Sequence, residues 1–252
     1  MPNHDVRMLP AARSGPMVNE SQARAPTWAR CRCSNARDSD ALVTPTPEAP
    51  DHATQLGEPM NQPSVRTDRV GLLLDQLTDA VELSRLRIDG ITDAEITWEP
   101  HPGMWSIRPQ GTATSSDAYG PGTFVLDADH TLDPFTAGPL TTIAWRVGHL
   151  VSAYAGRWEW TFGSRTTPPA QLVTFQPDTT MFEQLWVEID RWATAVDYLN
   201  DDQLDEIGFS QYPEGLDPHL PFIAIVRWMN RETIHHLAEI AILRDLYTAQ
   251  GH

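Results

Sequence analysis

The sequence predicts an all-α protein built on a bundle of four long helices. Four segments carry apolar residues at three- and four-residue steps, which is the period of an amphipathic helix. The stretches between them are rich in proline and glycine, and no segment shows a convincing alternation of apolar and polar residues. Four amphipathic helices without strands give a bundle, because each must bury its apolar stripe against the others.

The four helices are expected at about residues 67–89, 142–162, 179–199 and 222–247. The first ends at Gly90, a residue suited to the left-handed conformation that closes a helix. The second ends at Gly163 for the same reason. The fourth would be about 39 Å long at 1.5 Å per residue, enough to span the whole bundle.

The connections between the helices are long and irregular. Thr92 and Glu95 have the spacing of a capping box, which predicts one short helical turn after the first helix. Residues 110–140 hold several glycines and prolines and are expected to form a loop. Because a loop of this length in a compact domain usually covers a functional site, we expect it to shape a pocket.

Residues 1–64 differ from the rest of the chain. They are rich in Ala, Pro, Ser and Arg and have few aliphatic residues, which predicts a disordered N-terminal tail. An alternative is that Met60 is the true start and that residues 1–59 are not translated. In either case the folded domain is expected to be residues 65–252.

Composition excludes several classes of partner. The 252 residues carry a formal charge of −16, which disfavours binding to nucleic acid or to an anionic membrane surface. The cysteines, Cys31 and Cys33, indicate no disulfide framework. No signal peptide and no apolar stretch long enough to span a membrane is visible, so we expect a cytoplasmic protein.

Three residues are candidates for a metal site. Glu232 and His236 are four residues apart on the last helix and therefore share one face, where a carboxylate and an imidazole can bind one ion. His149 on the second helix could supply a third ligand from across the bundle. Taken singly, each has an ordinary explanation: a solvated pair four residues apart, and a core histidine bonded to a carbonyl.

Residues 67–248 resemble the DinB-like superfamily, which includes the mycothiol-dependent maleylpyruvate isomerase. Three blocks carry the resemblance: Ile91–Ile107 with its Trp98-Glu-Pro100 and Trp105, then Thr142–Leu150, then Asn230–Tyr247. The resemblance implies an up-down-down-up four-helix bundle with long loops and a divalent metal held by His149, Glu232 and His236. Relatives often have Gly-Gln where this chain has Ala238 and Glu239, which leaves the role of Glu239 open.

The resemblance also implies a thiol-dependent, mycothiol-type S-transferase or isomerase that acts on a small molecule. Zinc is the first choice of metal, and Ni, Mn and Fe also suit two imidazoles and one carboxylate. His235 and Glu239 are candidates for groups that support the ligands. Arg146 and Arg157 are expected to be solvent-exposed, although either could hold a substrate carboxylate.

Two other functions stay open at this point. One is a metal-dependent hydrolase with Glu239 as the base, and the other is a non-catalytic bundle that binds a metal or a small molecule. A homodimer is also open, because bundles of this type pair readily through an outer helix face.

Overall fold

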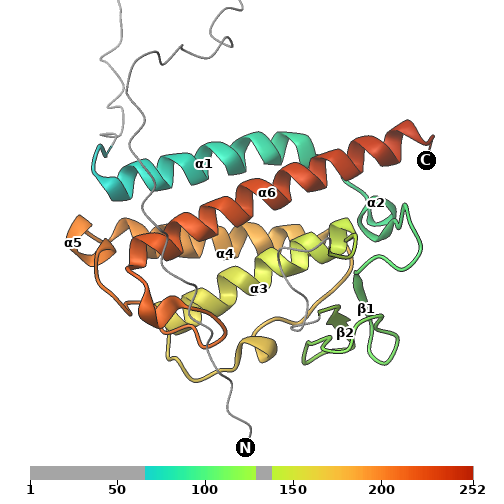
Figure 1. Ribbon diagram of the computed structural model, residues 1–252. Coiled ribbons are helices and arrows are strands. Elements are labelled where there is room, and N and C mark those ends of the chain that lie inside the picture. Colours follow the sequence, from blue (N-terminus) through green and yellow to red (C-terminus); the bar gives the residue numbers. More distant parts are fainter. Residues whose placement is uncertain (1–65, 129–137, 252) are drawn as a thin grey trace, which may run out of the picture. The chain divides into compact units, whose positions relative to one another are not determined.

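The computed structural model describes residues 66–128 and 138–251 (Figure 1). The predicted tail at residues 1–64, the alternative start at Met60 and part of the predicted loop, residues 129–137, lie outside this range. Within it, the prediction of an all-α fold is confirmed. The long helices are α1 (Arg69–Ile88), α3 (Ile143–Thr161), α4 (Thr180–Asp197) and α6 (Phe222–Ala249).

The helices pack in two parallel pairs, α1 with α6 and α3 with α4. In α6, Asn230 donates a hydrogen bond to the Leu73 carbonyl near the start of α1, and Arg244 donates to the Arg87 carbonyl near its end. In Figure 1 the colours of α1 and α6 progress in one direction, and those of α3 and α4 progress in the other. This is the up-down-down-up order. Because α3 and α4 are consecutive and parallel, the connection between them, residues 162–179, must return along the bundle.

Side-chain caps explain where the helices begin. Asp68 accepts a hydrogen bond from the Gly71 amide at the start of α1, and Thr142 accepts one from the Trp145 amide at the start of α3. The capping box predicted at Thr92 is present and starts the short helix α2 (Asp93–Thr97).

One contiguous apolar core joins all four long helices. Its largest fully buried side chains include Trp192 of α4, Tyr154 of α3 and Phe222 of α6. The Tyr154 hydroxyl lies 2.7 Å from the Thr233 hydroxyl of α6, and Thr233 donates to the Met229 carbonyl. These two buried hydroxyl groups at the contact between α3 and α6 are therefore hydrogen-bonded, which helps to fix the register of the two helices.

The predicted loop at 110–140 contains part of a small hairpin that the sequence analysis missed. Strands β1 (Ile107–Pro109) and β2 (Phe124–Leu126) pair antiparallel, with Ile107 opposite Leu126. Three residues per strand are too few for an alternating pattern to be recognised. The hairpin packs against α3 at Gly148, where an added Cβ would lie 3.0 Å from the Ile107 side chain.

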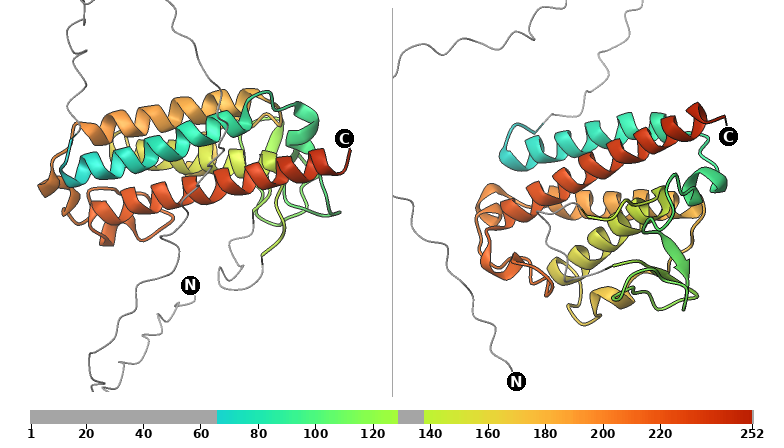
Figure 2. Two further views of the ribbon diagram at one scale, coloured as in Figure 1. Left: turned by 90° about the horizontal axis from the view of Figure 1, so that it is seen from above. Right: turned by 45° about the vertical axis from the view of Figure 1, so that its right-hand side comes forward.

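Three short helical turns complete the described chain: η1 (Pro169–Gln171), α5 (Asp201–Leu204) and η2 (Asp217–His219). Figure 2 shows the hairpin at the end of the bundle where α3 begins. Among the described helices, none combines the length and the apolar character needed to cross a membrane.

Candidate metal centre

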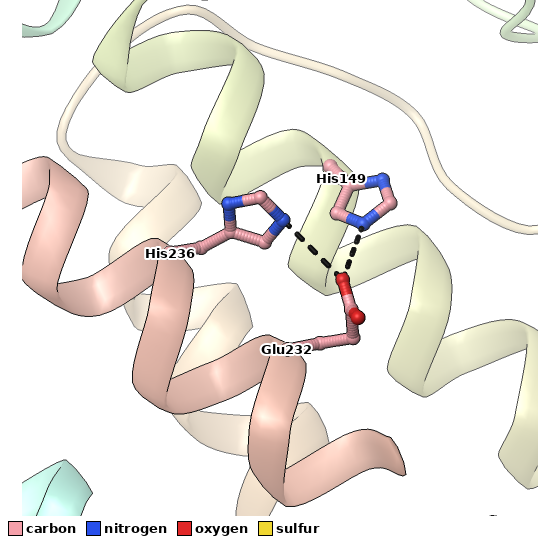
Figure 3. A group of neighbouring side chains, drawn as sticks. All are labelled: His149, Glu232 and His236. Carbon is pink, nitrogen blue, oxygen red and sulfur yellow. Dashed lines mark ion pairs between the residues drawn. The ribbon is translucent and has the colours of Figure 1, made fainter. Parts of the chain in front are cut away.

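The structure brings His149, Glu232 and His236 together between α3 and α6 (Figure 3). One ligand atom from each residue lies within 4.8 Å of the other two. Glu232 Oε2 is 3.7 Å from His149 Nε2 and 3.5 Å from His236 Nε2. Glu232 and His236 lie about one turn apart on α6, and His149 approaches them from the antiparallel helix α3. The three side chains therefore converge on one point.

The pKa values of Glu232 and His236 are both lowered in this cluster. Burial raises the pKa of Glu232, but the two imidazoles beside it outweigh that effect and hold the pKa well below its usual range. Burial lowers the pKa of His236, and the neighbouring His149 lowers it further. The group therefore favours an ionised carboxylate beside a neutral His236 imidazole, which is the protonation state that metal ligands require.

His236 is oriented by a carboxylate on its far side. Its Nδ1 lies 2.7 Å from Glu239 Oε2, and the same oxygen accepts a hydrogen bond from Arg146 of α3. This contact leaves Nε2 of His236 directed toward Glu232. A histidine held in this way through its second nitrogen is the usual arrangement of an imidazole that binds metal.

His149 is held by an aromatic ring. The Trp145 ring stacks on the imidazole with centroids 4.9 Å apart and planes 6° apart. The Trp145 indole N–H donates to the Asp127 carbonyl at 2.8 Å, so the segment after β2 fixes the ring that fixes the ligand. Asp127 belongs to the predicted loop at 110–140, so part of this loop helps to position a candidate ligand.

The donor set fits a divalent cation. Ligand atoms about 2.1 Å from a tetrahedral ion lie about 3.4 Å from one another. The Glu232 oxygen lies within a few tenths of an ångström of that separation from both imidazole nitrogens. Two imidazoles and one carboxylate leave one position of a tetrahedron open, and they suit Zn as well as Ni, Mn or Fe.

A cavity of about 310 Å³ opens beside His149; we call it the His149 cavity. Its lining includes three tryptophans, Trp105, Trp145 and Trp228, and two carboxylates, Asp127 and Glu214. Ser152 and Ala153 follow His149 on α3 and leave the space that a larger side chain would fill. The volume is at the lower end of the range for small-molecule sites.

The structure differs from the sequence-based expectations in the exposure of Arg146 and Arg157 and in the position of His235. Arg157 is buried and Arg146 is half-buried rather than exposed, with 11% and 14% of their side chains accessible. His235 is exposed and lies in the lining of a different hollow, whereas Glu239 contacts His236. The register of α3 could have revealed Arg157, because it lies two four-residue steps beyond His149 on the same side of the helix.

Comparison with known proteins supports the family resemblance. A family model described as the DinB superfamily matches residues 126–240, a range that contains His149, Glu232 and His236. The match confirms the resemblance that the sequence motifs carry. Searches of curated proteins and of solved structures found no significant match.

Proposed function

We propose that this chain, which matches the DinB superfamily over residues 126–240, binds one divalent metal ion and transfers a low-molecular-weight thiol to a small organic substrate. His149, Glu232 and His236 would hold the ion. The observation that carries the proposal is the convergence of their three ligand atoms within 4.8 Å beside a cavity. A divalent ion there would bind the thiol sulfur and lower its pKa, which supplies a thiolate at neutral pH.

The residues around the ligands have their own tasks. Trp145 and Glu239 keep the rings of His149 and His236 in place, so that little reorganisation accompanies binding. The tryptophans of the His149 cavity exclude water from the apolar part of a substrate.

The contacts of Glu239 support thiol transfer rather than hydrolysis. A hydrolase that uses Glu239 as its base would need this carboxylate to be free, but it is bound to both Arg146 and His236. A carboxylate bound to a guanidinium and an imidazole is a weak base. Thiol transfer does not need Glu239 to accept a proton, and it is therefore favoured.

The first test is metal content by elemental analysis of the wild type and His149→Ala. We expect about one equivalent per chain in the wild type and a large loss in the variant, because removal of one of three ligands destroys the site. His235→Ala is the matched control, since His235 is an exposed imidazole next to His236. Equal metal content in His149→Ala and the wild type would contradict the assignment.

The second test is consumption of thiol by the metal-loaded protein. Mycothiol, bacillithiol and glutathione are each incubated with a panel of electrophiles, and free thiol is titrated over time. Enzyme-dependent loss of thiol that His149→Ala abolishes supports the transferase. Stoichiometric metal with no thiol consumption and no turnover would instead indicate a non-catalytic binding protein.

A further inference from the structure

A second and larger hollow, of about 710 Å³, lies along α6; we call it the basic groove. Its lining includes Arg157, Arg227, Arg231 and His235. Asp217 is the one carboxylate among its described lining residues. In a chain with a formal charge of −16, a groove with three arginines and one carboxylate is locally suited to an anion.

Arg157 is built into this groove rather than merely near it. The residue is 9% exposed, and its guanidinium lies between two aromatic rings, 4.4 Å from the centroid of Tyr212 and 3.9 Å from that of Trp228. Gly156 makes the close approach of Tyr212 possible, because a Cβ there would lie 2.8 Å from the ring. The two rings hold the planar guanidinium in one orientation.

The charge of Arg157 is incompletely matched. Its Nε lies 3.4 Å from Asp217 Oδ2 and has no hydrogen-bond partner among the described residues. Asp217 also accepts a hydrogen bond of 2.9 Å from the Ser210 hydroxyl. Burial lowers the pKa of Arg157, although Asp217 opposes that change. A guanidinium has five N–H donors, so donors remain for a ligand.

The rest of the groove suits the apolar part of a ligand. Trp228, Leu220 and Ile225 lie in its lining. Leu216 and Ile234 also line it and expose 67% and 37% of their surface. Exposed aliphatic residues that flank a hollow with a buried cation indicate an organic ligand with an apolar body and one anionic end.

We propose that the basic groove is a binding site for a small organic carboxylate, whose two oxygens receive the guanidinium of Arg157. Arg227 and Arg231 would add attraction at the rim, and Arg231 also lies 3.2 Å from Glu232 Oε1. Arg157 and Trp228 line the His149 cavity as well, so the carboxylate would bind at a wall shared with the candidate metal centre. The proposal does not depend on a bound metal.

The test compares phenylacetate with phenylacetamide, which share a shape and differ in charge. Binding to the metal-free full chain is measured by isothermal titration calorimetry at low ionic strength. We expect phenylacetate to bind at least about tenfold more tightly than the amide, and Arg157→Gln to lose at least about tenfold, because a bidentate carboxylate–guanidinium pair is a strong charge-assisted contact. Arg227→Gln should weaken binding about twofold to threefold, as expected for an exposed charge.

Arg191→Gln is the matched control. Arg191 also stacks on a tryptophan, with its guanidinium 3.2 Å from the Trp158 ring centroid, but it does not line the groove. It should leave phenylacetate binding unchanged. Melting temperatures of all variants show which of them fold. If Arg157→Gln does not fold, Arg157→Lys replaces it, because lysine keeps the charge but lacks the planar fork of the guanidinium.

Three outcomes would overturn the proposal. The first is equal binding of phenylacetate and phenylacetamide. The second is unchanged phenylacetate binding in a folded Arg157 variant, which would leave the contact with Asp217 as a purely structural ion pair. The third is a full effect of Arg157 together with no effect of Arg227, which would place the carboxylate in the His149 cavity instead of the groove.

Discussion

Replacement of Asp127 by Asn should destabilise the segment that shapes the His149 cavity. The Asp127 side chain is fully buried. Its Oδ2 accepts hydrogen bonds from the Ser106 amide, Arg108 Nε and the Thr114 hydroxyl. Its Oδ1 accepts from the Thr114 amide and from the amide and hydroxyl of Ser115. Every hydrogen-bond partner of both oxygens is a donor. An amide nitrogen in place of either oxygen would therefore lose the hydrogen bonds that this oxygen accepts.

The magnitude follows from which oxygen is replaced. Hydroxyl groups can rotate away, but two N–H donors face each oxygen and would oppose the new amide nitrogen. An unsatisfied buried donor costs about 1–3 kcal/mol, so the loss is about 2–6 kcal/mol. The nitrogen should take the Oδ1 side, where Thr114 is exposed and water can reach the amides. We therefore expect a loss of about 2 kcal/mol, at the lower end of the range.

The pH dependence has a defined sign. Burial raises the pKa of Asp127, but hydrogen bonds from Ser106 and Thr114 outweigh it and lower the pKa overall. A carboxyl whose pKa is lower in the folded than in the unfolded chain stabilises the fold above the unfolded value, about pH 4. That contribution is lost as the pH falls through the folded pKa. The difference between wild type and Asp127→Asn should therefore shrink below about pH 4.

The assay is urea unfolding followed by circular dichroism, at pH 7 and at several values down to pH 3. Asp79→Asn is the control, because Asp79 is exposed on α1, and it should change stability by less than about 0.5 kcal/mol. A loss in Asp127→Asn no larger than that of the control would refute the argument. A difference that grows as the pH falls would refute the assigned sign.

Two further predictions concern the candidate sites. Glu239→Gln should weaken Zn binding about tenfold to a hundredfold, because it loosens the contact that orients His236. Competition with a chelator measures the affinity. Unchanged Zn affinity would show that Glu239 does not support the metal site. Gly156→Ala should destabilise the chain by about 1–3 kcal/mol and weaken phenylacetate binding, because the added Cβ displaces the Tyr212 ring from Arg157. Calorimetry measures both the stability and the binding. A variant with unchanged stability and unchanged binding would show that the Tyr212 ring is not confined.

Much of the fold could be read from local patterns. The apolar period placed all four long helices within about two residues of their observed ends, which is the usual uncertainty of helix limits. The capping box at Thr92 was also readable, because it depends on residues three apart. The hairpin of β1 and β2 was not, since its strands are short and its stabilising contacts join residues far apart in the chain, such as Asp127 with Ser106 and Arg108.

The sequence by itself determined that Glu232 and His236 share a helical face, because the α-helical repeat sets that relation. It also offered His149 as a third ligand from a facing helix, and the resemblance to a family strengthened that choice. The tertiary structure decided that α3 runs antiparallel to α6 in a register that brings His149 to Glu232. It also selected Glu239 rather than His235 as the partner of His236, and it alone buried Arg157 between Tyr212 and Trp228. The partners of Arg157 come from segments distant in the chain, so their meeting depends on the packing of the whole bundle and not on any local pattern.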